Sequence, residues 1–185
     1  MTVTVLDPNA ALLVIDLQKG IAALPAAHPI DDVVRQAAAL AEAFRRRGLP
    51  VILVNVAGRA PGRTERARGG DFPPDWTDFL PALSPQPHDH VVTKHSPGAF
   101  TNTGLDAYLR AAAVTQLVIA GVATSNGVEC TARQAFELGF NVAFATDAMT
   151  DRDAAAHDNS VTRIFPAIGE TGTTQELIER LANEA

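Results

Sequence analysis

The sequence predicts an α/β protein, a three-layer α/β/α sandwich around a parallel, doubly wound sheet of about five to six strands. Short runs rich in valine and isoleucine alternate with helix-like segments along almost the whole chain. These runs are apolar on both faces, as the strands of a buried parallel sheet are. A length of 185 residues suits one domain with a sizeable core, so we expect residues 1–185 to form a single domain.

Five segments carry the strand pattern. Each is short, mostly apolar and bounded by polar or turn-forming residues. In chain order they are residues 11–16 (ALLVID), 51–56 (VILVNV), 90–94 (HVVTK), 116–122 (QLVIAGV) and 141–147 (NVAFATD).

The segments between these strands carry the helical pattern. In residues 31–48 apolar side chains recur every three or four positions, Asp31 can cap the amino end and Gly48 can end the helix. Further helices are expected near residues 103–113, 125–138, 154–165 and 174–183. This alternation favours helical crossovers between parallel strands.

One long segment has neither pattern. Residues 57–86 are rich in glycine, proline and arginine and show no clear period. Loops of this length in a compact domain are usually functional, so we expect this one to cover the ligand-binding edge of the sheet. Its apolar residues Phe72, Trp76 and Phe79 are candidates for a pocket lid or a subunit interface.

Composition and charge narrow the classes of function. Apolar residues make up 46% of the chain and charged residues 19%, which is a globular balance. The formal net charge of -6 argues against nucleic acid or an anionic membrane as partner, and a small-molecule substrate is expected instead. The amino-terminal segment lacks a basic region, and Asp16 interrupts its apolar run. With one cysteine in the chain, these features predict a cytoplasmic protein.

Polar residues at the strand ends are the site candidates, because doubly wound sheets bind ligands beyond the carboxyl ends of their strands. Asp16 ends the first strand, Lys94 ends the third, and the turn TSNG follows the fourth. Asp16 could instead cap a turn, and Lys94 could be a surface lysine. A helix that begins at TSNG would present free backbone N–H groups to an anion. We expect the three segments to converge on one pocket.

The segments VIDLQ, VVTKHSPGAF and GVATSNGVECTARQAFELGFNVAFATDAM, in this order, resemble the isochorismatase-like hydrolase superfamily, which includes nicotinamidases and other cysteine amidohydrolases. The resemblance covers nearly the whole chain and implies the cysteine hydrolase fold. In the amidohydrolases, a motif of the form G-x-x-T-x-x-C-V-x-x-T-A supplies the nucleophile, and an Asp and a Lys complete a triad. The resemblance places Asp16 and Lys94 in the acid and lysine positions, and Gly127 in the position of the nucleophile.

Cys130 lies beyond that position in the motif. Gly121 and Thr124 before Gly127, and Thr131 after it, match the motif, and a shift that aligned Cys130 would break these matches. Cys130 is therefore expected one helical turn deeper, as a small core residue, and a cysteine in apolar surroundings is inert.

The isochorismatase branch also carries glycine at the nucleophile position, so the chain resembles a Gly-for-Cys variant of that branch. This implies hydrolysis without a cysteine nucleophile, on a vinyl ether such as isochorismate or a related activated substrate. Asp16 would be the acid catalyst and Lys94 its electrostatic partner. Burial raises the pKa of a carboxyl group, whereas a nearby ammonium lowers it, so a base that activates water stays open as a second role for Asp16. Two alternatives are a catalytically silent member that binds a small metabolite and an amidohydrolase that uses Cys130.

The resemblance implies further features of the site. A cis peptide bond between Val122 and Ala123 would aim the N–H groups of Ala123 and Gly127 as an oxyanion hole. Candidate substrate contacts are Phe100 and Ser96 in KHSPGAF, and the loop arginines Arg59, Arg63, Arg66 and Arg68, which could face an acidic substrate.

No metal and no cofactor are expected. Nicotinamidases carry an Asp-His-His cluster after the second strand, whereas this segment reads NVAGRAPGR. His88 and His90 lack an evident third ligand. The glycine-rich GETGTT lacks the lysine of a P-loop. Because the superfamily commonly forms dimers or larger assemblies, the resemblance also implies a homo-oligomer.

Overall fold

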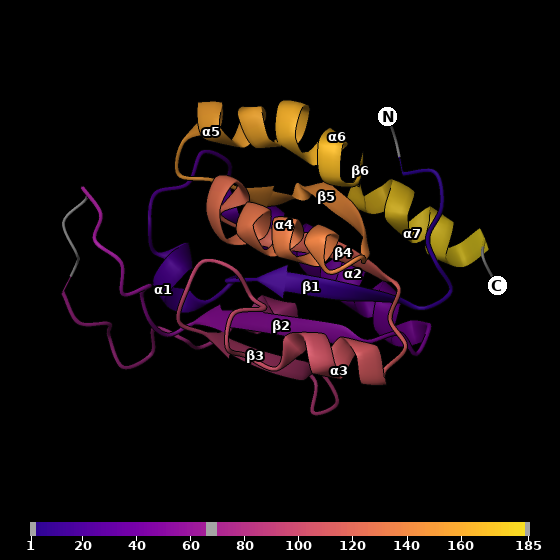
Figure 1. Ribbon diagram of the computed structural model, residues 1–185, viewed down its shortest axis with the longest axis horizontal. Helices are drawn as coiled ribbons and strands as arrows, with labels where there is room; N and C mark the ends of the chain where they lie inside the picture. Colours follow the sequence, from indigo (N-terminus) through magenta and orange to yellow (C-terminus); the bar gives the residue numbers. More distant parts are fainter. Residues whose placement is uncertain (1–2, 66–69, 184–185) are drawn as a thin grey trace.

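The computed structural model describes residues 3–65 and 70–183, and its centre is a parallel six-stranded sheet in the order β3-β2-β1-β4-β5-β6 (Figure 1). The strands are β1 (Ala10–Ile15), β2 (Val51–Val56), β3 (His90–Lys94), β4 (Gln116–Val122), β5 (Asn141–Thr150) and β6 (Glu170–Gly172). Helices cover both faces of this sheet, so the predicted α/β/α sandwich with a parallel, doubly wound sheet is confirmed.

The helices divide between the two faces of the sheet. One face packs against α2 (Ile30–Arg46) and α7 (Thr174–Asn183). The other packs against α3 (Leu105–Ala111), α4 (Glu129–Glu137) and α6 (Phe165–Ile168). A π-helical turn, η2 (Thr124–Val128), leads into α4, and a second, η3 (Ser160–Ile164), joins α5 (Ala154–Asn159) to α6. Two short elements, α1 (Lys19–Ala22) and η1 (Pro81–Leu83), complete the fold. No helix of the described ranges is long and apolar enough to cross a membrane.

The sheet buries a separate apolar core on each face. Side chains alternate along a strand, so Leu12 and Val14 of β1 join the core under α2, and Leu13 and Ile15 join the core under α3 and α4. All residues of β1 are buried, as the two-sided apolar pattern of a central strand requires.

The topology places a switch point between β1 and β4. The chain passes from β1 to β2 and β3 at one edge, then returns to place β4 on the other side of β1. Gly121 of β4 has φ 119°, and a Cβ there would lie 2.0 Å from the Ile15 carbonyl oxygen. Only glycine therefore lets β4 approach β1 at this point. Sheets of this kind bind ligands in the crevice beyond such a switch point.

Some element boundaries differ from those predicted. β5 continues beyond residue 147 to Thr150, past an irregular register between Ile119 and Gly121 of β4. The helix predicted over 154–165 is interrupted by η3. The sequence did not predict α1, η1 or β6, because elements of three or four residues are too short to show a period.

The segment 57–86 attaches to the sheet through Trp76. The Trp76 indole donates to the Val56 carbonyl oxygen at 2.8 Å, and its ring stacks on Phe72 with centroids 4.4 Å apart. A Cβ on Gly20 would lie 2.2 Å from the same ring, so glycine makes room for it. Phe79 packs against the core under α2. Arg66 and Arg68 lie outside the described residues.

Candidate active site

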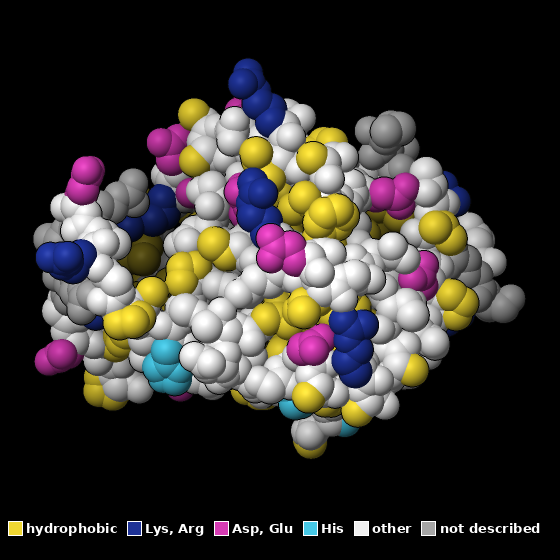
Figure 2. Space-filling model, in the orientation of Figure 1, with side chains coloured by type: hydrophobic (Ala, Val, Ile, Leu, Met, Phe, Trp, Pro, Cys, Tyr) yellow, Lys and Arg dark blue, Asp and Glu magenta, His cyan; other side chains and the backbone are white. Residues whose placement is uncertain are grey.

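A cavity of about 400 Å³ opens at the carboxyl ends of the strands. Its lining includes one residue at or just beyond the end of each of five strands, namely Asp16, Val56, Lys94, Ala123 and Asp151. Residues 58–60, 62 and 64 also line it, so the long segment covers this edge of the sheet as predicted. Figure 2 shows the surface hollowed on the left, where Figure 1 places α1 and this segment, with basic side chains at the edge of the hollow.

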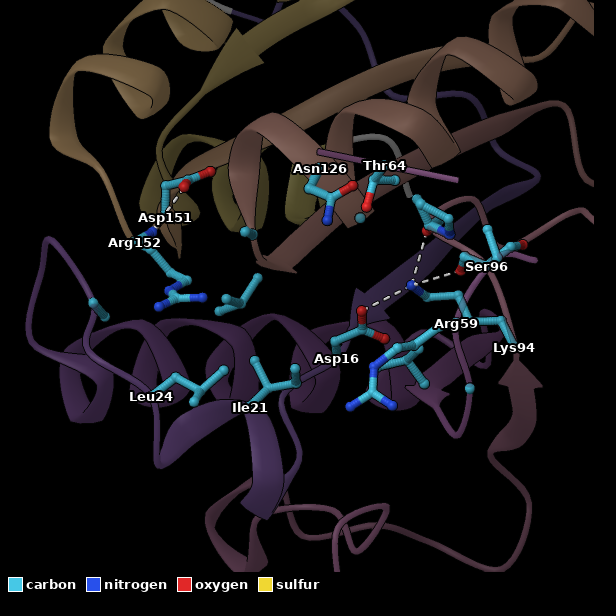
Figure 3. A pocket seen from close by; sticks show the side chains of 18 of the residues that line it. Asp16, Ile21, Leu24, Arg59, Thr64, Lys94, Ser96, Asn126, Asp151 and Arg152 are labelled. Atoms are coloured by element: carbon cyan, nitrogen blue, oxygen red, sulfur yellow. Dashed lines mark hydrogen bonds and ion pairs between the residues drawn. The ribbon is translucent and has the colours of Figure 1, made fainter. Parts of the chain in front are cut away.

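Asp16 and Lys94 form a buried ion pair in this cavity (Figure 3). Asp16 has a left-handed φ of 52°, an uncommon backbone conformation that accompanies the turn out of β1. The Lys94 ammonium donates to Asp16 Oδ2 at 2.8 Å, to the Pro97 carbonyl oxygen at 2.8 Å and to the Ser96 carbonyl oxygen at 3.3 Å. Three acceptors thus fix Lys94, whose side chain is 1% exposed.

The other carboxyl oxygen of Asp16 is not used by the fold. Oδ1 is buried and has no hydrogen-bond partner within the described part of the chain. Burial raises the pKa of Asp16 from 3.8 to about 6, although the nearby Lys94 ammonium lowers it. Burial therefore outweighs the ion pair, and Asp16 can hold a proton at mildly acidic pH.

Gly127 faces the same ion pair from η2. A Cβ on Gly127 would lie 3.1 Å from Asp16 Oδ2 and 3.2 Å from the Val122 carbonyl oxygen. A side chain at this position would therefore start beside the carboxylate. Gly127 also lines the cavity, together with its neighbour Asn126.

The turn after β4 has the backbone that the resemblance implied. The peptide bond between Val122 and Ala123 is cis, and both residues line the cavity. The Ala123 carbonyl oxygen accepts from the Asn126 and Val128 N–H groups at 3.0 and 3.1 Å, which closes the π-helical turn.

The predicted substrate contacts divide into two groups. Ser96 and Arg59 line the cavity. The guanidinium of Arg59 donates to the Gly70 carbonyl oxygen at 2.9 Å and lies 4.1 Å from the centroid of the Phe72 ring. Arg63 is exposed and does not line the cavity.

Phe100 was expected in the pocket, but the structure places it elsewhere. Its ring packs against the core under α3 and α4, with its centroid 6.1 Å from that of Phe140, and it does not line the cavity. Its N–H donates to Gln134 on α4 at 3.2 Å. The turn after β3 therefore directs Ser96 toward the cavity and Phe100 toward the helices.

Cys130 differs from the expectation of a buried core residue. It is half-buried on α4, because the helix turns this position partly toward solvent. It is not among the residues that line the cavity. Burial and the adjacent Glu129 carboxylate raise the pKa of its thiol, and the cations Lys94 and Arg133 offset this only in part. The thiol is therefore protonated at neutral pH and a poor nucleophile.

Sequence reasoning missed Asp151, which follows β5 and lines the cavity. Its Oδ2 accepts from the N–H and hydroxyl of Ser125, at 2.7 and 2.8 Å, and its Oδ1 accepts from the Arg152 N–H at 2.7 Å. Asp151 thereby joins the end of β5 to η2. The signal was a carboxylate at a strand end, as at Asp16, but the predicted strand stopped three residues too early.

Residues 23–29 form a further wall that the sequence did not predict. Leu24, Pro25 and Ala26 line the cavity, and the Ala27 N–H donates to the Asp151 carbonyl oxygen at 2.7 Å. His28 contacts Thr150 at 2.9 Å through its ring. The end of β5 therefore holds both this wall and η2 in place.

Potential metal ligands do not gather in the described ranges: no three His, Cys, Asp or Glu side chains lie close enough together to hold an ion. His90 stacks on Tyr108, with ring centroids 3.6 Å apart.

Comparison with known proteins gives the same family from sequence and structure. The family model described as "Isochorismatase domain" matches residues 10–176. The chain is 40% identical over 184 residues to the isochorismatase family protein YwoC of Bacillus subtilis, covering 94% of each chain. It superposes on the structure of an isochorismatase family protein from Burkholderia thailandensis with a TM-score of 0.93 and 41% identity, covering 97% of this chain and 98% of that one. It is also 38% identical over 150 residues to a streptothricin hydrolase of Streptomyces noursei, covering 79% of this chain and 51% of that enzyme.

Proposed function

The chain belongs to the isochorismatase family of hydrolases, and on that premise we propose that it hydrolyses an activated small molecule without a cysteine nucleophile. One observation carries the proposal: Asp16 lines the cavity, its buried Oδ1 has no hydrogen-bond partner among the described residues, and its pKa is raised to about 6. A carboxylic acid with one oxygen fixed by an ammonium, and the other without a partner in the described part of the protein, is suited to donate a proton to a substrate. Asp16 is therefore the acid catalyst, and not the base that the ion pair alone would favour.

The reaction that fits this acid is hydrolysis of a vinyl ether such as isochorismate. Asp16 Oδ1–H protonates the terminal alkene carbon, and the ether carbon becomes an oxocarbenium ion. Water adds to that carbon and returns a proton to the Asp16 carboxylate. The hydroxyl proton of the resulting hemiketal passes to the ether oxygen as the C–O bond to that oxygen breaks, which releases an alcohol and a carbonyl product.

Lys94 is the electrostatic partner in this scheme. When Asp16 gives up its proton, the new carboxylate lies 2.8 Å from the Lys94 ammonium. The ammonium stabilises the negative charge at the moment it forms, and its two carbonyl acceptors keep it in place before and after the step. Because this charge pair is buried, its interaction is less screened than one in water.

Gly127 supports the proposal because it has no side chain. In our scheme it occupies the nucleophile position of the cysteine amidohydrolases. The Sγ of a cysteine here would lie beside Asp16, because the Cβ itself would be 3.1 Å from Oδ2. Without that side chain, water and substrate can reach the acid, and the backbone N–H groups of Ala123 and Gly127 remain the candidate oxyanion donors.

The alternative is amide hydrolysis, the reaction of the cysteine amidohydrolases whose motif this sequence resembles. It would need a nucleophile. Cys130 lies outside the cavity lining and its pKa is raised, so neither its place nor its protonation state favours that role. The silent, binding-only alternative is disfavoured by the retained and buried Asp16–Lys94 pair.

The test is a hydrolysis screen with a pH–rate profile. Isochorismate and simple vinyl ethers form one panel, and aliphatic and aromatic amides form the other. We expect turnover in the first panel, with kcat/KM constant at low pH and falling about tenfold per pH unit above about pH 6, as loss of one essential proton requires.

Each other outcome has a distinct meaning. A rate that rises with pH through about 6 would make Asp16 a base that activates water. Turnover of amides that disappears in Cys130→Ser would restore the cysteine route. Binding without turnover in both panels would favour the silent protein.

A further inference from the structure

The cavity has a second charged end, formed by Arg152. Figure 3 shows Arg152 beside Asp151 on one side of the cavity, and Asp16 with Lys94 and Arg59 on the other. Arg152 follows directly on Asp151, whose Oδ1 accepts from the Arg152 N–H at 2.7 Å. Because Asp151 is buried at the junction of β5 and η2, the backbone that carries Arg152 is held firmly while its side chain extends into the cavity lining.

Among the described residues, the charge of Arg152 has no ion-pair partner. None of the ion pairs between described residues includes Arg152. The two carboxylates of the cavity lining are already engaged, Asp16 with Lys94 and Asp151 with Ser125 and backbone N–H groups. Arg59, the other arginine of the lining, is engaged by the Gly70 carbonyl oxygen and the Phe72 ring. The chain as a whole is acidic, with a net charge of -6, but Arg152 adds a positive charge to the cavity lining.

The lining between the two charged ends is apolar. Ile21, Leu24 and Ile30 line the cavity, as does Val122 of β4. In Figure 3, Leu24 lies below Arg152, and Ile21 lies between Leu24 and Asp16. The cavity therefore offers an acid and an ammonium at one end, apolar side chains in the middle and a guanidinium at the other end.

From this arrangement we infer that Arg152 is a specificity-determining residue that binds an anionic group of the substrate, carboxylate or phosphate, separated from the reacting bond by an apolar body. A guanidinium recognises such groups through charge-assisted hydrogen bonds, and usually in bidentate geometry. The inference rests on the proposed function, because it takes Asp16 as the reacting end. It adds the chemistry of the far end of the substrate, which the acid alone does not specify.

A charge series of isosteric probes tests this assignment without turnover. Benzoate, benzamide and benzamidinium have almost the same shape and carry charges of about −1, 0 and +1 near neutral pH. Binding of each is titrated by NMR at fixed ionic strength, because surface electrostatics depend on salt. The wild-type protein should bind benzoate about tenfold more tightly than benzamide, and benzamidinium most weakly.

Two variants of Arg152 carry the test. In Arg152→Gln the preference for benzoate over benzamide should disappear, while benzamide binding stays within about twofold of wild type. In Arg152→Glu the order should reverse, with benzamidinium bound best. Arg163→Glu is the matched control, because this substitution changes the net charge by the same amount as Arg152→Glu. Arg163 is exposed on η3 and does not line the cavity. Arg163→Glu should keep the wild-type order.

The assignment is overturned by either of two results. The first is a wild-type protein that shows no preference for benzoate, and the second is an Arg152→Gln variant that keeps the preference. If Arg59→Gln abolishes the preference in that second case, the anion binds at Arg59. Thermal unfolding of each variant separates loss of binding from loss of folding. Since no turnover is needed, a failed hydrolysis screen leaves this result interpretable, and a lost probe ranking leaves acid catalysis by Asp16 open.

Discussion

Asp16 and Asp151 stand at the ends of β1 and β5, and each is 5% exposed, yet their surroundings differ. Both oxygens of Asp151 accept hydrogen bonds, from Ser125 and from backbone N–H groups. Asp16 is held by Lys94 at Oδ2 alone, and its Oδ1 has no partner among the described residues. Equal burial therefore gives one carboxylate that organises the fold and one that is available for chemistry. Satisfied hydrogen bonding, and not burial, separates the two.

The largest expected effect is on catalysis. Asp16→Asn keeps the shape of the side chain and removes its proton, and general acid catalysis contributes about 10²–10⁴-fold, so kcat/KM should fall by about 10³. Steady-state kinetics on a substrate found in the screen measures this. Asp151→Asn is the matched control, with the same change at a second strand end, and should lose less than about tenfold. Equal losses in both variants would erase the distinction between the two carboxylates.

The second effect is on the free energy of unfolding, and we expect it at Asp151. Asp151→Ala leaves the Ser125 N–H and the Arg152 N–H without their acceptor, so the free energy of unfolding should fall by about 2–4 kcal/mol. Urea denaturation measures it. Asp153 caps the amino end of α5, and its exposed carboxylate accepts from the Ala155 N–H at 2.8 Å. Asp153→Ala should therefore lower the free energy of unfolding by about 1 kcal/mol. A loss at Asp151 no greater than at Asp153 would show that Asp151 does not hold η2 to β5.

The third effect is the pH dependence of stability. Burial raises the pKa of Asp16 from 3.8 to about 6, so between these values the folded state binds more protons than the unfolded state. The free energy of unfolding therefore falls as pH rises, and Asp16→Asn lacks this contribution. Between about pH 4.5 and about pH 7, wild type should lose about 2 kcal/mol relative to the variant, at no more than about 1.4 kcal/mol per pH unit. Parallel curves for the two proteins would mean that burial does not perturb Asp16.

The smallest effect should come from the cysteine. Cys130 is half-buried on α4 and does not line the cavity, so Cys130→Ser should change kcat/KM by less than about twofold. Alkylation of wild-type protein with iodoacetamide, followed by mass spectrometry and an activity assay, gives an independent measurement. Inactivation that tracks the extent of alkylation would place the thiol in the chemistry after all.

The sequence predicted the parts of this site that lie on regular elements. Asp16 and Lys94 end predicted apolar strands, and parallel strands bring their carboxyl ends to one edge, so a shared pocket could be predicted from position. That the two act together was implied by the family resemblance. Asp151 and Arg152 could not, because β5 passes an irregular register with β4 and continues to Thr150. Local propensity does not reveal a strand that is extended by its pairing partner.

Side-chain direction in turns was harder to predict than position. Ser96 and Phe100 were both expected to face the pocket, but the turn after β3 sends Phe100 to the helix layer. Cys130 was expected in the core, yet its neighbours Thr131 and Ala132 are the buried ones. Such directions depend on tertiary packing against α4, which one sequence without its structure does not contain.

The attachment of Trp76 gives the protein a built-in optical reporter. Trp76 is the one tryptophan of the chain, and its indole donates to the carbonyl oxygen of Val56, a residue of the cavity lining. Its ring stacks on Phe72, which in turn lies beneath the guanidinium of Arg59 at the cavity. A ligand that displaces Arg59 removes its contact with Phe72, and Phe72 in turn contacts the indole. Intrinsic fluorescence of the unlabelled protein can therefore follow the occupancy of the cavity in real time.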